Sequence, residues 1–126
     1  MLSKRLKSFK YAFAGVADLF RSQPNSRIHL LFTALTLLGG FYFKVSTPEW
    51  YIIIICISMV FAAEALNTSL EYLCDLVSPG HHPLAGKAKD AAAAAVLFMA
   101  GGAFIIGFCI FAPRVLGFLQ QIFPIN

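Results

Sequence analysis

One hydrophobic stretch of this chain carries polar residues at regular helical spacing. Residues 51–63 are almost entirely apolar, and the sequence then runs without a helix breaker through Glu64, Asn67, Glu71 and Asp75. At ~100° per residue, these four positions fall within a stripe ~80° wide on one face of a helix. Because acids are costly inside a membrane helix, such a stripe indicates a functional site.

The composition points to a membrane environment. Of the 126 residues, 59% are hydrophobic and 13% are charged, whereas a soluble domain is usually about 45–50% apolar. The length suits one domain. We therefore expect a single integral-membrane domain over residues 1–126 with an all-α fold.

Periodicity divides the chain into five segments. Residues 1–22 repeat apolar side chains every three or four positions with basic residues between them, which is typical of an amphipathic helix on the membrane surface. Membrane-spanning helices are predicted over residues 28–43, 49–77 and 91–112, the second of which extends into the cytoplasm. Residues 78–90 are predicted to form a polar cytoplasmic loop.

Local signals mark the ends of these helices. Pro24 separates the surface helix from the first span, and Pro113 is expected to close the last one. Thr47, Pro48 and Glu49 form a helix start, with Thr47 as N-cap, proline at the first helical position and an acid in the first turn.

The basic residues set the orientation. Most of the lysines and arginines lie in the N-terminal segment or in the 78–90 loop, while the connection between the first two spans holds Lys44 alone. The positive-inside rule then places the N-terminus and the 78–90 loop in the cytoplasm. The polar stripe therefore opens toward the compartment that contains nucleotide.

The stripe leaves two kinds of chemistry open. The chain has no Gly-rich phosphate loop ending in Gly-Lys-Ser/Thr and no soluble-kinase signature. Glu71 could hold Mg²⁺, Lys89 could neutralise a phosphoryl group, and the deeper Glu64 could take a proton from a lipid alcohol. A proton or cation pathway would use similar residues.

The motifs resemble those of a known family. Residues 64–71 read EALNTSLE, residues 75–77 read DLV and residues 82–93 read HPLAGKAKDAAA. Together with FKYAF at 9–13 and NSRIHL at 25–30, they closely resemble the bacterial integral-membrane diacylglycerol kinase and undecaprenol kinase family. The resemblance covers nearly the whole chain.

The resemblance implies an activity and a set of site residues. It implies ATP-dependent phosphorylation of a lipid alcohol with Mg²⁺, by a homotrimer with active sites shared between neighbours in the bacterial cytoplasmic membrane. We expect the partners to be the lipid and the membrane, not nucleic acid. Glu64 would be the catalytic base that meets the lipid hydroxyl, with Asn67 as its polar neighbour. Nucleotide contacts are expected from Lys4, Tyr11, Gln23, Glu71, Gly80, His82, Gly86, Lys89 and Asp90.

Two departures qualify this expectation. Glu71 is expected to be a metal ligand, but Gln23 stands where the family commonly has a second, acidic ligand, and an amide oxygen carries no charge. The 25–29 and 82–85 segments look more like the undecaprenol-kinase branch, which favours undecaprenol over diacylglycerol as the substrate. The alternatives are an inactive family member and a non-enzymatic, oligomeric proton or cation pathway. His29 is expected to be an interfacial residue, and Asp75 is as easily a solvated acid as a site residue.

Overall fold

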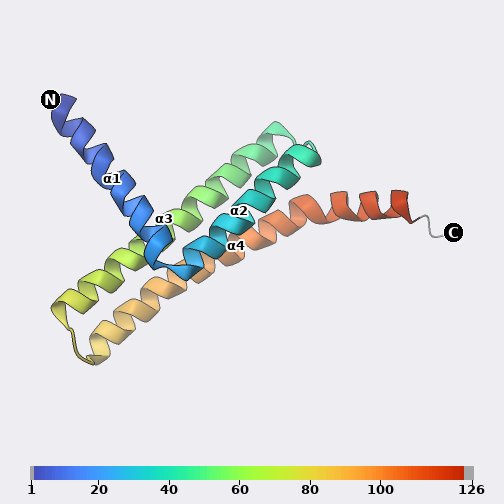
Figure 1. The fold of residues 1–126 in the computed structure, drawn as a ribbon. Coiled ribbons are helices and arrows are strands. Elements are labelled where there is room, and N and C mark those ends of the chain that lie inside the picture. Colours follow the sequence, from blue (N-terminus) through green and yellow to red (C-terminus); the bar gives the residue numbers. More distant parts are fainter. Residues whose placement is uncertain (1, 124–126) are drawn as a thin grey trace.

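The computed structural model describes residues 2–123 of the chain, with side chains from Arg5 onward. The described residues form four helices: α1 (Leu2–Ser22), α2 (Pro24–Tyr42), α3 (Thr47–Val77) and α4 (Pro83–Ile122). Helices α2, α3 and α4 run alongside one another, whereas α1 projects away from them (Figure 1). The all-helical prediction is confirmed.

Two of the helices have the length and hydropathy needed to cross a membrane. These are α3, with 31 residues, and α4, with 40. Helix α2 has 19 residues and starts at Pro24, four residues before the predicted span over 28–43, so its first turn is polar. The expectation of a first span at α2 stays a prediction.

The loop predicted over 78–90 is too long. Helix α4 already begins at Pro83, because proline fits the first helical turn and His82 provides the cap. The His82 Nδ1 atom accepts a hydrogen bond from the backbone N–H of Leu84 at 3.2 Å. Residues 78–82 alone connect α3 to α4, and Lys89 and Asp90 therefore lie on a helix.

The prediction that the last span ends at residue 112 is also wrong for the helix, since α4 continues through Pro113 to Ile122. Proline has no backbone N–H, so at position 113 it leaves the carbonyl oxygen of Cys109 without its usual helical partner. The Arg114 Nη1 atom donates to the carbonyl oxygen of Ile110 at 2.5 Å, and Nη2 reaches Glu49 on α3 at 2.8 Å. Arg114 therefore contacts a carbonyl one turn back on α4 and joins α4 to the start of α3.

Helix α3 is the centre of the fold. It packs most extensively against α4 and also contacts α2 and α1. A small core of Val45, Ile53 and Ile110 forms at the end of the bundle opposite the α3–α4 connection. The N-cap of α3 is Ser46 instead of the predicted Thr47, because Glu49 Oε2 accepts from the Ser46 backbone N–H at 2.7 Å.

Candidate active site

Glu64 lies in the middle of α3 and is almost fully buried, with 2% of its surface exposed. Two residues of α2 approach its carboxylate. Ser26 Oγ donates to Oε2 at 3.3 Å, and His29 Nε2 lies 3.1 Å from Oε1. Because Ser26 and His29 are three positions apart, they share a face of α2, and that face is turned toward Glu64.

The second carboxylate oxygen of Glu64 has no hydrogen-bond donor. Among the side chains that the structure describes, Glu64 Oε1 and Asn67 Oδ1 are buried without a hydrogen-bond partner. Among these side chains, the basic group nearest to Oε1 is His29 Nε2 at 3.1 Å. An unsatisfied buried acceptor is costly. Such atoms are suited to receive a hydroxyl, an amide or a cation from a ligand.

A second polar cluster surrounds Glu71, two helical turns from Glu64. Asn67 Nδ2 donates to Glu71 Oε1 at 3.0 Å from the same helix, and Gln23 Nε2 donates to Glu71 Oε2 at 3.1 Å. Gln23 stands between α1 and α2, where Pro24 starts the second helix. The interruption between α1 and α2 therefore places the Gln23 side chain beside Glu71, the predicted metal ligand.

Two sets of contacts hold the segment between α1 and α2 against the other helices. Arg27 donates to the carbonyl oxygens of Phe20 at 2.7 Å and Arg21 at 2.6 Å, which satisfies the end of α1. On α3, the Tyr72 hydroxyl donates to Asp18 Oδ2 at 2.8 Å. The C-terminal end of α1 is thus anchored beside Glu71, while its N-terminal part projects away (Figure 1).

The start of α4 carries a charged pair. Lys89 Nζ lies 2.5 Å from Asp75 Oδ1 on α3, and both side chains are substantially exposed. The hydrogen bond to Asp75 raises the pKa of Lys89, and the negative charges of Asp75 and Glu71 act in the same direction. Lys89 therefore remains cationic at neutral pH, and Asp75 serves as its partner.

The remaining predicted nucleotide contacts are on the surface. Gly80, Gly86 and Asp90 are exposed, and exposed His82 uses its ring to cap α4. Tyr11 is 71% exposed on the part of α1 that projects away from the bundle. The side chain of Lys4 lies outside the described residues.

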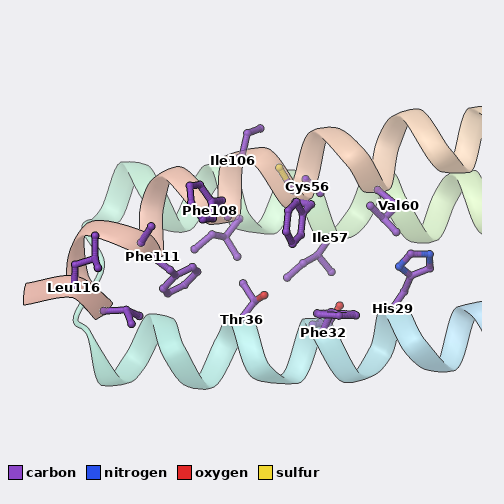
Figure 2. Close-up of a pocket in the computed structure, with 18 residues that line it drawn as sticks. His29, Phe32, Thr36, Cys56, Ile57, Val60, Ile106, Phe108, Phe111 and Leu116 are labelled. Atoms are coloured by element: carbon purple, nitrogen blue, oxygen red, sulfur yellow. The ribbon is translucent and has the colours of Figure 1, made fainter. Parts of the chain in front are cut away.

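An apolar cavity of about 770 Å³ lies between α2 and α4 on the surface of α3. Its lining is mostly aliphatic and aromatic, including Ile57 and Val60 of α3 and Phe108 of α4. Figure 2 shows His29 at one end of the cavity and Leu116 toward the other. His29 therefore borders both the cavity and the Glu64 carboxylate.

The structure brings together some of the predicted residues and adds others. Ser26 and His29 contact the Glu64 carboxylate, and Asn67 and Gln23 donate hydrogen bonds to Glu71. The sequence interpretation missed Ser26 and His29 as neighbours of Glu64. A usable signal was present, because these two polar residues are at helical spacing at the start of α2, immediately before its apolar part.

The described residues contain no group of three or more His, Cys, Asp or Glu side chains able to hold a metal ion among themselves. Any cation at Glu71 would therefore depend on amide oxygens, water or phosphate for its other ligands. Magnesium commonly uses one or two carboxylates together with substrate phosphates, so this donor set is compatible with it.

Comparisons with known proteins agree with the motifs. The family model for prokaryotic diacylglycerol kinase matches residues 10–111. An undecaprenol kinase of Bacillus subtilis is 40% identical over 114 residues, covering 90% of this chain and 93% of the relative. A diacylglycerol kinase of Synechocystis is 36% identical over 115 residues, covering 90% and 66% of the two chains, and one of Haemophilus influenzae is 31% identical over 96 residues, covering 75% and 80%.

Proposed function

The chain belongs to the prokaryotic diacylglycerol kinase family of lipid kinases, and from this premise we propose that it transfers the γ-phosphoryl group of ATP to the hydroxyl of a membrane lipid alcohol, with Glu64 as the general base. The observation that carries the proposal is the buried Glu64 carboxylate, whose Oε1 is unpaired and faces His29 at the end of an apolar cavity. Family membership also favours a kinase over a non-enzymatic ion pathway.

The proposed step needs a general base for the hydroxyl proton and positively charged groups beside the nucleotide phosphates. The oxygen of the lipid hydroxyl forms a bond to the γ-phosphorus as the bond to the β-phosphate oxygen breaks, and Glu64 takes the hydroxyl proton. Lys89, held at Asp75, supplies positive charge near Glu71. The cavity offers apolar surface for the hydrocarbon tail while the hydroxyl reaches Glu64.

Glu71 is the proposed magnesium ligand, with the amide oxygen of Gln23 as a weaker second one. Support comes from the Glu71 carboxylate and its two amide neighbours, Gln23 and Asn67, which now donate from their nitrogen atoms to Glu71. Rotation of these amides would present oxygen atoms to a cation, and Asn67 Oδ1 is buried without a hydrogen-bond partner. When bound, Mg²⁺ would neutralise charge on the nucleotide phosphates.

We expect undecaprenol to be a better substrate than diacylglycerol. The support is the undecaprenol kinase relative, which matches over 93% of its length. The test is phosphate transfer from radiolabelled ATP in mixed micelles, with the two lipids compared side by side at equal mole fraction. Equal or higher kcat/KM for diacylglycerol would contradict the substrate assignment, and transfer to neither lipid would contradict the kinase proposal.

Gln23→Glu should lower the Mg²⁺ concentration needed for half-maximal activity by about three- to tenfold, because a second carboxylate beside Glu71 adds negative charge in a partly hydrated site. The measurement is a magnesium titration of activity at fixed ATP concentration. Gln23→Ala is the matched control, since it also removes the amide but adds no charge. A requirement that is unchanged or raised in Gln23→Glu would exclude Gln23 from the metal site.

We propose that the protein is a homotrimer in the bacterial cytoplasmic membrane, with its N-terminus in the cytoplasm and sites shared between neighbours. Support comes from α4, where a Cβ atom added to Gly101, Gly102 or Gly107 meets nothing within 4 Å, so packing within one chain does not explain these glycines. Helix α1 projects away from the other helices of its own chain, and its Tyr11 is 71% exposed, which leaves it open to contact with a neighbour. A mass in detergent other than that of three chains would refute the trimer.

A further inference from the structure

His29 lines the apolar cavity and also contacts the proposed base. Its Nε2 lies 3.1 Å from Glu64 Oε1, and 22% of its side chain is exposed. Among the side chains that the structure describes, it is the only basic group within 4.0 Å of the Glu64 carboxylate. Ser26 holds the other oxygen, Oε2.

The two oxygens of Glu64 therefore have different surroundings. Oε2 accepts a hydrogen bond from Ser26, which fixes the carboxylate against α2. Oε1 is buried, lacks a hydrogen bond and faces the His29 ring. A general base must present an oxygen to the hydroxyl whose proton it takes, and Oε1 is the carboxylate oxygen that has no hydrogen bond.

We propose that His29 is a positioning residue of the phosphoryl-transfer reaction, which orients Glu64 Oε1 toward the lipid hydroxyl at the end of the cavity. This inference rests on the proposed function and deepens it. The reacting oxygen of Glu64 is Oε1, because Ser26 occupies Oε2. The hydroxyl approaches Oε1 from the end of the cavity that His29 lines.

Packing alone does not account for this histidine. The wall of the cavity that His29 shares is formed mainly by aliphatic and aromatic residues, for which leucine is a natural substitute of similar size. An imidazole at this point adds a polar group to an otherwise apolar surface, and its nearest charged neighbour is Glu64.

The test compares two substitutions of His29 in the full-length protein in mixed micelles. His29→Leu should lower kcat for lipid phosphorylation by about 10- to 100-fold while leaving KM for MgATP within about twofold, because the nucleotide residues lie elsewhere. His29→Gln should recover kcat to within about threefold of the unsubstituted protein, since its amide nitrogen can donate near the position of the ring Nε2. His81→Leu, an exposed histidine outside the assigned site, is the control and should retain full activity.

A double variant separates positioning from folding. If His29 acts through Glu64, adding His29→Leu to Glu64→Gln should reduce the residual activity by less than about twofold, because the group that it orients is already absent. A multiplicative further loss, equal defects in His29→Gln and His29→Leu, or full activity in His29→Leu would overturn the inference and leave the kinase proposal standing. Absence of lipid phosphorylation by the unsubstituted protein would overturn both.

Discussion

Replacement of Glu64 by glutamine should abolish phosphoryl transfer without preventing the protein from folding or binding nucleotide. Glutamine has nearly the same shape as glutamate and can keep the contact with Ser26, but its amide cannot take a proton from an alcohol at neutral pH. General-base catalysis typically contributes about 10²- to 10⁴-fold. We therefore expect kcat for the lipid to fall by about that factor, with KM for MgATP changed by less than about twofold.

The measurement is steady-state phosphate transfer in mixed micelles, together with nucleotide binding at equilibrium. Glu49→Gln is the matched control, because it makes the same chemical change on the same helix, ~22 Å away, where Glu49 contacts Arg114. It should keep the activity of the unsubstituted protein. More than about a tenth of the original kcat in Glu64→Gln would show that another group accepts the proton. Loss of nucleotide binding together with activity would indicate a folding defect.

The helical spacing of polar residues on α3 was sufficient to predict which of them share a face. Glu64, Asn67 and Glu71 repeat at intervals of three and four, and the structure places Asn67 in contact with Glu71. This relation is internal to one helix, so it depends only on the 3.6-residue period. The resemblance of the motifs then gave the family, which the comparisons support.

Contacts between helices were not predictable in the same way. The approach of Ser26 and His29 to Glu64 depends on the rotation of α2 about its axis, which is set by the break at Pro24 and by the packing of α2 on α3. Sequence periodicity shows that Ser26 and His29 share a face but not what that face meets. His29 was for this reason interpreted as an interfacial residue.

Prolines misled the prediction of helix ends. Pro83 follows a stretch rich in proline, glycine and histidine, and such a stretch favours a loop, yet proline is equally suited to the first turn of a helix. Pro113 removes the backbone hydrogen bond to Cys109, but α4 continues to Ile122 with Pro113 inside it. At Pro83 the His82 ring caps the start of the helix.

Leucine at position 40 should destabilise the bundle more than leucine at any open glycine of the chain. Gly40 is buried on α2, and a Cβ atom added there would lie 2.6 Å from Trp50 Cη2 and 2.9 Å from Cζ2. The Trp50 ring cannot withdraw freely, because it packs on Phe41 with ring centroids 4.8 Å apart and borders the core around Ile53. Overpacking of this kind typically costs ~1–3 kcal/mol.

The helix itself would partly offset this cost, since leucine has a higher helix propensity than glycine by about 0.8 kcal/mol. Gly117→Leu is therefore the control: it brings the same gain within α4, where an added Cβ atom meets nothing within 4 Å. The difference in thermal unfolding midpoint between the two variants in detergent isolates the clash, and we expect Gly40→Leu to be lower by several degrees.

A second substitution identifies the ring responsible for the clash. The three Trp50 atoms nearest to Gly40 are Cη2, Cζ2 and Cζ3, all of which belong to the distal part of the indole. Phenylalanine lacks this part, so Trp50→Phe should recover part of the stability lost in Gly40→Leu, although Trp50→Phe alone removes packing and is destabilising. Equal unfolding midpoints for Gly40→Leu and Gly117→Leu would instead mean that α2 shifts away from Trp50 at little cost. That shift would also move Ser26 and His29, which lie on the same helix and contact Glu64. The activity of Gly40→Leu therefore reports whether these contacts depend on the packing of Gly40 against Trp50.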